Sequence, residues 1–215
     1  MICKFIRCKV PAEKYDGFYQ AQLQWDKLSG VDGFLFQTGG RTIDDPEMMV
    51  ILAFWESIEQ HQNFMENIHD KIIAESKQDN YYTVNISTVF NVDNVLKSDS
   101  GDVFDELTST EFLKISDFLV IPEQKEHFTG IQENMLIPEL AKQEEMIQGF
   151  FSGHTQSGER FLKSSFWKKE TDFQNYFRSR NPELINKANV DADLVKEFEY
   201  RVRLNNEWFI EAEMK

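Results

Sequence analysis

The chain has 215 residues, of which 37 are acidic and 23 basic, so its formal net charge is -14 at pH 7. This acidic balance argues against binding to nucleic-acid phosphates or to anionic membrane surfaces, because both need clustered Lys and Arg. No apolar run approaches the ~20 residues of a membrane span, and the start of the chain carries too many charges for a signal peptide. We therefore expect a cytoplasmic protein.

The first half of the chain predicts six elements in the order βαββαβ. Apolar and β-branched runs indicate strands, and apolar residues at helical spacing indicate helices. The expected ranges are a strand over 2–10, a helix over 11–28, strands over 33–38 and 48–55, a helix over 58–72 and a strand over 81–92. This order is typical of a ferredoxin-like fold.

The second half predicts the same order after a segment without periodicity. Residues 94–110 are rich in Ser, Asp and Gly, which indicates a linker. Beyond it we expect a strand over 112–121, a helix over 122–145, strands over 149–155 and 161–167, a helix from about Thr171, and a long strand over 197–212 bent at Asn205 and Asn206. The predicted domains are therefore 1–93 and 111–215, joined by the linker 94–110.

Three groups of residues recur in the same order in both halves. Phe-Trp at 54–55 and Gln-Asn at 62–63 return 112 residues later at 166–167 and 174–175. Residues 31–34 are matched by 147–150, and residues 10–14 by 121–125. Three matches in one order favour a tandem duplication.

The expected strand over 48–55 is apolar on both faces. Ile51, Ala53 and Trp55 fall on one side, and Leu52 and Phe54 on the other. A sheet of this kind is buried on both faces. We therefore expect an α+β protein whose two ferredoxin-like repeats pack sheet to sheet as an intramolecular pseudo-dimer, with a further homodimer left open.

The βαββαβ order of elements, the "V/I-x-Gly-Phe" motif and the Phe-Trp to Gln-Asn junction resemble the antibiotic biosynthesis monooxygenase-like (ABM-like) family of the dimeric α+β barrel fold. The resemblance covers nearly the whole chain, twice. The first copy, with Leu52-Ala53-Phe54-Trp55-Glu56 and His69-Asp70, resembles small uncharacterised bacterial members. The resemblance implies a cavity between helices and sheet for a small aromatic or apolar molecule, and an oxygenation that needs neither metal nor flavin.

In the haem-degrading branch of this family, the characteristic residues are an Asn on strand one and a Trp and a His on helix two. In this chain the Trp position falls on Phe64 or Tyr176, and the His position on Ala74 or Asn186. Without an axial His at that position we disfavour haem binding or degradation, and we expect no cofactor and no metal.

Aromatic and amide side chains are the candidate ligand-binding residues. Trp55 and Trp167 occupy equivalent positions, where each could stack on an aromatic ligand or simply fill the core. The complete set of candidates is Trp25, Trp55, Trp167, Tyr176, Asn63 and Asn175. The recurrence of the two Asn residues also suits a structural role.

Three histidines are the candidate catalytic bases. His61 and His69 lie eight residues apart on one expected helix, which is too far apart for a shared metal. Each could act as a general base or be a buried structural residue. His154 could line a cavity with Ser152 and Tyr176, or lie at the sheet edge in water.

The two cysteines, Cys3 and Cys8, are five residues apart in one expected strand and so face opposite sides. We interpret them as reduced packing residues. The sequence leaves two functions open: a cofactor-independent monooxygenase, or a non-catalytic ligand-binding or scaffold protein of the same fold.

Overall fold

The computed structural model describes residues 1–97, 106–180 and 182–213. Two compact units make up the chain: unit 1 comprises Met1–Val89 together with the residues from Val202 onward, and unit 2 comprises Phe90–Arg201. These borders follow contacts in space, whereas the predicted domains 1–93 and 111–215 follow the sequence repeat. In this division, residues 90–93 of the first predicted domain fall in unit 2, and the residues from Val202 onward of the second predicted domain fall in unit 1.

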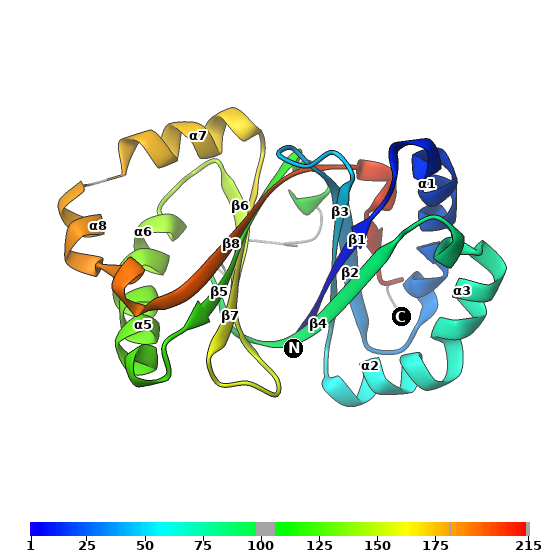
Figure 1. The fold of residues 1–215 in the computed structure, drawn as a ribbon, viewed down its shortest axis with the longest axis horizontal. Helices are drawn as coiled ribbons and strands as arrows, with labels where there is room; N and C mark the ends of the chain where they lie inside the picture. Colours follow the sequence, from blue (N-terminus) through cyan, green and yellow to red (C-terminus); the bar gives the residue numbers. More distant parts are fainter. Residues whose placement is uncertain (98–105, 181, 214–215) are drawn as a thin grey trace. The chain divides into compact units, whose positions relative to one another are not determined.

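Unit 1 contains a four-stranded antiparallel sheet with its helices on one face (Figure 1). The order across the sheet is β4-β1-β3-β2. The elements are β1 (Ile2–Lys9), α1 (Tyr15–Leu23), β2 (Phe34–Thr42), β3 (Met48–Trp55), α2 (Ile58–Phe64), α3 (Asp70–Ser76) and β4 (Val84–Val95). This is the predicted βαββαβ order.

Local sequence explains where the helices of unit 1 begin, turn and end. The Ser57 hydroxyl accepts the Gln60 backbone N–H at 3.2 Å and so caps α2. A π-helical turn over Met65–His69 joins α2 to α3 and shifts the phase of the helical side chains. α1 is likewise followed by a tighter 3-10 stretch over Gln24–Gly30, which carries Trp25.

Unit 2 repeats this arrangement, with its helices again on one face of the sheet (Figure 1). The order across the sheet is β8-β5-β7-β6. The elements are β5 (Phe112–Val120), α5 (Lys125–Ile131), α6 (Ile137–Ala141), β6 (Met146–His154), β7 (Arg160–Trp167), α7 (Glu170–Ser179), α8 (Pro182–Ala188) and β8 (Leu194–Leu204).

Several observed elements differ from their sequence-based ranges, among them the last strand and the start of the predicted linker. β8 ends at Leu204, because the Asn205 side chain accepts the Glu207 N–H and starts a short turn before β9 (Ile210–Glu211). The predicted single strand to residue 212 is therefore wrong. β4 runs on through residues 94 and 95 of the predicted linker, of which residues 98–105 lie outside the described residues.

Both units thus have the α+β, ferredoxin-like architecture that the sequence predicts. The same ring contacts recur in each. Trp55 meets Phe64 with centroids 4.9 Å apart, and Trp167 meets Tyr176 at 5.5 Å. No helix among the described residues is long and apolar enough to cross a membrane.

Candidate functional site

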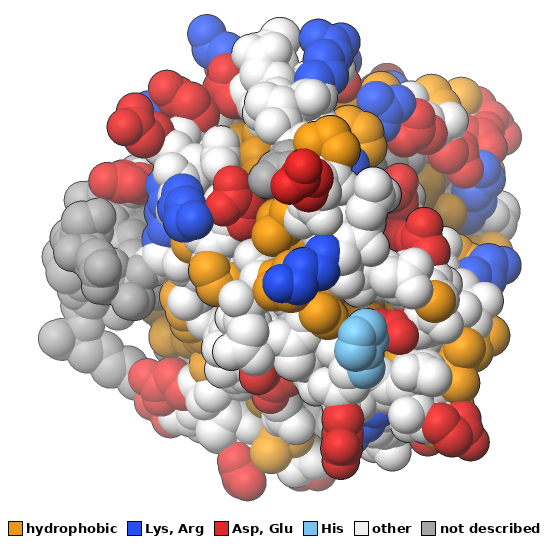
Figure 2. Space-filling model, turned by 90° about the vertical axis from the view of Figure 1, so that its left-hand side faces the viewer, with side chains coloured by type: hydrophobic (Ala, Val, Ile, Leu, Met, Phe, Trp, Pro, Cys, Tyr) orange, Lys and Arg blue, Asp and Glu red, His pale blue; other side chains and the backbone are white. Residues whose placement is uncertain are grey.

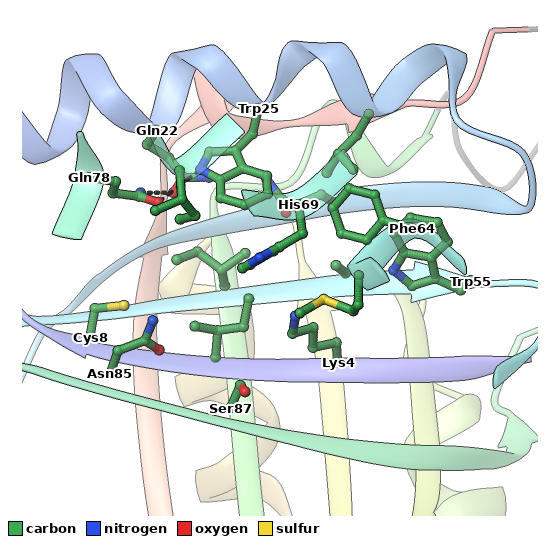
Figure 3. Close-up of a pocket in the computed structure, with 17 residues that line it drawn as sticks. Lys4, Cys8, Gln22, Trp25, Trp55, Phe64, His69, Gln78, Asn85 and Ser87 are labelled. Carbon is green, nitrogen blue, oxygen red and sulfur yellow. Dashed lines mark hydrogen bonds between the residues drawn. The ribbon is translucent and has the colours of Figure 1, made fainter. Parts of the chain in front are cut away.

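A cavity of about 150 Å³ lies between the helices and the sheet of unit 1 (Figure 3). Its walls combine rings with a few polar groups. The lining residues include Lys4, Trp25, Gln37, Ala53, Trp55 and His69. Asn85 and Ser87, both exposed on the edge strand β4, line the side that reaches solvent.

Three neighbouring strands place two polar side chains around one small residue on the floor of this cavity. Lys4 of β1 and Gln37 of β2 are both in register with Ala53 of β3. Because Ala53 carries only a methyl group, it leaves open the space that a larger residue of β3 would fill. The floor of the cavity is therefore polar at its two sides and vacant at its centre.

Lys4 is a buried cation, with 8% of its surface exposed. Its ammonium donates to the Met65 sulfur at 3.1 Å, and a thioether is a weak acceptor. Burial lowers the pKa of Lys4 to about 8. Among the described residues, no Asp or Glu lines this cavity.

His69 projects from the helical layer into the cavity, between Trp25 and the sheet (Figure 3). Its ring lies 5.6 Å from that of Trp25 and 5.8 Å from that of Phe64. Nδ1 is 2.9 Å from Asp70 Oδ1. In the tautomer in which Nδ1 carries the ring proton and donates a hydrogen bond to Asp70, Nε2 is unprotonated and can accept a proton. Burial lowers the pKa of His69, which keeps the imidazole in its neutral, basic form, although the Asp70 hydrogen bond opposes this shift.

A row of buried hydrogen bonds holds the far wall of the cavity. Trp25 Nε1 donates to Gln78 Oε1 at 2.9 Å, and Gln78 Nε2 donates to Gln22 Oε1 at 2.9 Å (Figure 3). The indole ring of Trp25 is therefore fixed in one orientation. A fixed ring presents a ready-made stacking surface to a ligand.

Trp55 closes the opposite end of the cavity. Its indole Nε1 has no hydrogen-bond partner among the described residues. The equivalent Trp167 of unit 2 donates to Ser165 Oγ at 2.9 Å, and Ser165 is the residue in register with Lys114. Unit 1 has Ala53 in the place of that serine, so the Trp55 N–H lacks the hydroxyl acceptor.

His61 lies behind Trp55 and outside the residues that line the cavity. Its ring meets Trp55 at 5.6 Å and 70°, the same values that relate Phe173 to Trp167 in unit 2. Burial lowers the pKa of His61 to about 4, so the ring is neutral at pH 7. The geometry therefore gives His61 a packing role.

Unit 2 has a larger cavity at the same place, of about 460 Å³. Tyr176 lines it, whereas Trp167 is buried and is not among the lining residues. Lys114 corresponds to Lys4, but here it forms an ion pair with Glu199 at 2.5 Å. Lys163 is also on the floor, where its ammonium donates to Gln132 Oε1 at 2.9 Å, and burial lowers its pKa to about 8.

The charges around the unit 2 cavity are of both signs. Three cations and three carboxylates line it, so their formal charges cancel. These residues are Lys114, Lys163, Arg180, Asp191, Glu197 and Glu199. Figure 2 shows the helical face of this unit, where acidic and basic side chains are interspersed with apolar ones. The lining of the unit 1 cavity, by contrast, carries Lys4 and no Asp or Glu among the described residues.

The remaining predicted site residues lie elsewhere. The His154 Nδ1 accepts the backbone N–H of Ser157 at 2.8 Å and that of Gln156 at 3.2 Å, so this ring supports the turn after β6. Asn63 and Asn175 are exposed on their helices and line neither cavity. Trp25, Trp55 and His69 are brought together in unit 1.

Sequence reasoning missed Lys4, Gln37 and Lys114. One signal was present: Lys4 and Lys114 stand 110 residues apart, each in an otherwise apolar start of a strand. A lysine in a strand is normally interpreted as facing solvent. Cys8 also lines the unit 1 cavity, and burial raises the pKa of its thiol to about 12, so it is unreactive there.

Neither cavity offers both the room for a haem and a histidine ligand among the described residues. The one with a histidine measures about 150 Å³, below the ~300 Å³ at which pockets for drug-sized molecules begin. The larger cavity is lined by no histidine among the described residues. Within the described part of the chain, no group of three or more His, Cys, Asp or Glu could hold a metal ion.

The two ferredoxin-like units with helix-covered cavities define a protein of the dimeric α+β barrel class. Residues 2–90 match the Domain of unknown function (DUF4937). The chain is 42% identical over 80 residues to the uncharacterized protein YdbC of Bacillus subtilis (strain 168), a stretch that is 36% of this chain and 67% of that protein. The chain therefore belongs to the same family as YdbC, and the resemblance of its first copy to small uncharacterised bacterial proteins is confirmed.

Solved structures show the same fold across almost the whole chain. A "putative monooxygenase" from Fusobacterium nucleatum matches with a TM-score of 0.75 at 13% identity, covering 94% of this chain and 91% of that one. One from Lactobacillus acidophilus matches with a TM-score of 0.71 at 10% identity, covering 98% and 95%. An anthrone oxidase-like protein matches with a TM-score of 0.73 at 14% identity, covering 99% and 94%. These likenesses confirm the monooxygenase-like fold.

Proposed function

We propose that the unit 1 cavity binds a small aromatic molecule and oxygenates it without a cofactor. The observation that carries this proposal is the position of His69, a neutral base that lines a cavity walled by Trp25 and Trp55. A cavity of about 150 Å³ is the size known to hold one benzene ring. The substrate is therefore a single-ring compound.

In this mechanism the protein supplies shape and one base. The indoles hold the ring, and His69 Nε2 removes a proton from an acidic C–H of the substrate. The resulting carbanion reduces O₂ by one electron, and the radical pair combines to a hydroperoxide. Loss of water then leaves a carbonyl, so one CH₂ and one O₂ give one C=O and one H₂O.

An oxygen electrode tests the proposal with a panel of single-ring compounds that carry an acidic CH₂, in classes such as enolisable aryl ketones and arylacetate esters. We expect O₂ uptake with at least one class, and its loss in His69→Phe, which keeps a ring against Trp25 and Phe64. Binding measured by calorimetry should survive this substitution. Compounds that bind to the protein without any O₂ uptake would contradict the proposed oxygenase activity.

A second candidate function is ligand binding without chemistry. The unit 2 cavity favours it, because no histidine lines it among the described residues and its Lys114 is neutralised by Glu199. In that case the unit would hold a larger molecule by its rings and ion pairs. Binding that is insensitive to oxygen and leaves the ligand unchanged would support this candidate.

A further inference from the structure

Three hydrogen-bond donors on the walls of the unit 1 cavity lack a good acceptor. The Lys4 ammonium has only a thioether, and Gln37 Nε2 and Trp55 Nε1 have no partner among the described residues. All three side chains are at least nine-tenths buried. A buried donor without an acceptor destabilises the folded protein, and a charged donor does so more strongly.

The residues that carry these donors are neighbours on one face of the sheet. Lys4 and Gln37 flank Ala53, and Trp55 follows two residues later on the same face of β3. Figure 3 shows the Trp55 indole nitrogen turned toward the side of the cavity that Lys4 occupies. The three atoms without a good partner are all donors and so cannot satisfy one another, whereas an acceptor atom of a ligand in the cavity can.

We propose that the unit 1 cavity selects an anionic ligand, a single-ring molecule whose carboxylate, phenolate or enolate oxygen is received by Lys4, Gln37 and Trp55. This inference rests on the proposed function, since it names the kind of molecule that the same cavity takes. In the oxygenation the three donors hold the oxyanion that forms when His69 removes the proton.

The comparison between the units supports an anion in unit 1 in particular. Lys114 has Glu199 beside it on the edge strand, and Glu197 also lines that cavity. The edge strand of unit 1 offers Asn85 and Ser87 to its cavity instead. In a chain with a net charge of -14, a buried lysine without a carboxylate leaves its counter-charge to the ligand.

Calorimetry with benzoate and its neutral isostere benzamide tests the inference on the full chain at pH 7. We expect benzoate to bind at least tenfold more tightly than benzamide. Lys4→Met should remove this preference by weakening the binding of benzoate much more than that of benzamide. Gln37→Leu should weaken benzoate binding by a smaller factor.

A second pair of variants leaves Lys4 in place. Ser87→Glu puts a carboxylate on the exposed strand, as Glu199 does in unit 2, and should abolish the preference for benzoate. Ser87→Gln, of the same size but neutral, should keep it. The preference should also fade between pH 7 and pH 9.5, as Lys4 loses its proton.

The outcomes separate the two proposals. Equal affinity for benzoate and benzamide, or a preference that survives both Lys4→Met and Ser87→Glu, would overturn the anionic selectivity and leave the aromatic cavity intact. Binding of neither compound would overturn the aromatic cavity itself, and the selectivity with it.

Discussion

Lys4 and Gln37 lie on the two strands that flank β3, and both are paired in register with Ala53. The smallest residue of that row thus stands between two polar side chains that are 8% and 3% exposed. A larger residue at position 53 would separate the two polar groups and remove the cavity floor.

Ala53→Leu should therefore abolish ligand binding without unfolding the protein. The added carbons enter vacant space, so we expect the free energy of unfolding to stay within about 1 kcal/mol of the wild type. Urea denaturation and benzoate calorimetry measure the two effects. Ala21→Leu is the control: it overpacks a buried helix position outside the cavity, should cost about 1–3 kcal/mol, and should leave binding unchanged. Retained binding in Ala53→Leu would contradict the assignment of the site.

Lys4→Met should stabilise the protein at pH 7, by up to about 3 kcal/mol, because it removes a buried charge whose pKa falls from 10.5 to about 8. Between pH 8 and pH 10.5, Lys4 keeps its proton in the unfolded chain and has largely lost it in the folded chain. Wild-type stability therefore rises with pH from about 8 toward 10.5, and the advantage of the variant shrinks over that interval.

Urea denaturation of both proteins at pH 7, 8.5 and 9.5 tests this linkage. The exposed Lys71→Met is the control and should change stability by less than about 0.5 kcal/mol at every pH. A stability difference between Lys4→Met and wild type that does not change with pH would show that Lys4 is not held as a buried cation.

His61→Phe should make the fold less sensitive to acid. His61 has a pKa of about 4 when folded against 6.5 ordinarily, so the unfolded chain binds more protons in this interval. The wild type loses stability as the pH falls from 6.5 toward 4, by up to about 3 kcal/mol, and the variant lacks this loss.

The two units provide the comparison for this prediction. Phe173 already holds the equivalent ring position against Trp167. Phe173→His should add acid sensitivity to the chain, whereas His61→Phe removes it. Thermal melts of the wild type, His61→Phe and Phe173→His at pH 7, 5.5 and 4.5 would show these opposite trends in the melting temperature. Melting temperatures that change with pH in parallel in all three proteins would argue against the packing role.

Arg160→Met should destabilise the protein by about 3 kcal/mol or more. The guanidinium donates to both oxygens of Asp117, at 2.8 and 2.7 Å, and Asp117 is 1% exposed. The variant leaves this buried carboxylate without its guanidinium. Lys9→Met removes solvent-accessible ion pairs with Asp45 and Glu47 and should cost much less. Equal losses in urea denaturation would contradict the difference in burial.

Much of the fold could be predicted because each element carries its own periodic pattern. The apolar run over 48–55 becomes β3, whose side chains are buried on both faces. The recurrence of Phe-Trp with Gln-Asn correctly located two equivalent strand-to-helix junctions. The last strand was misjudged, because a side-chain cap at Asn205 competes with the ladder.

The site was predicted only in part. Trp25, Trp55 and His69 do meet in one cavity, but helical spacing placed His61 near the same side as His69. The π-helical turn over Met65–His69 changes the phase between them, so that one ring packs behind Trp55 and the other enters the cavity. Such a turn has no clear signature in the sequence.

The sequence by itself determined the order of strands and helices, the repeat of that order and the family to which the chain belongs. These follow from local periodicity and from residues that recur at fixed spacing. Only the tertiary structure decided that Lys4 is a buried cation in a cavity lined by no Asp or Glu among the described residues. The physical reason is that strand alternation fixes the face on which a side chain lies, whereas burial and counter-charge depend on the helices and strands packed around it.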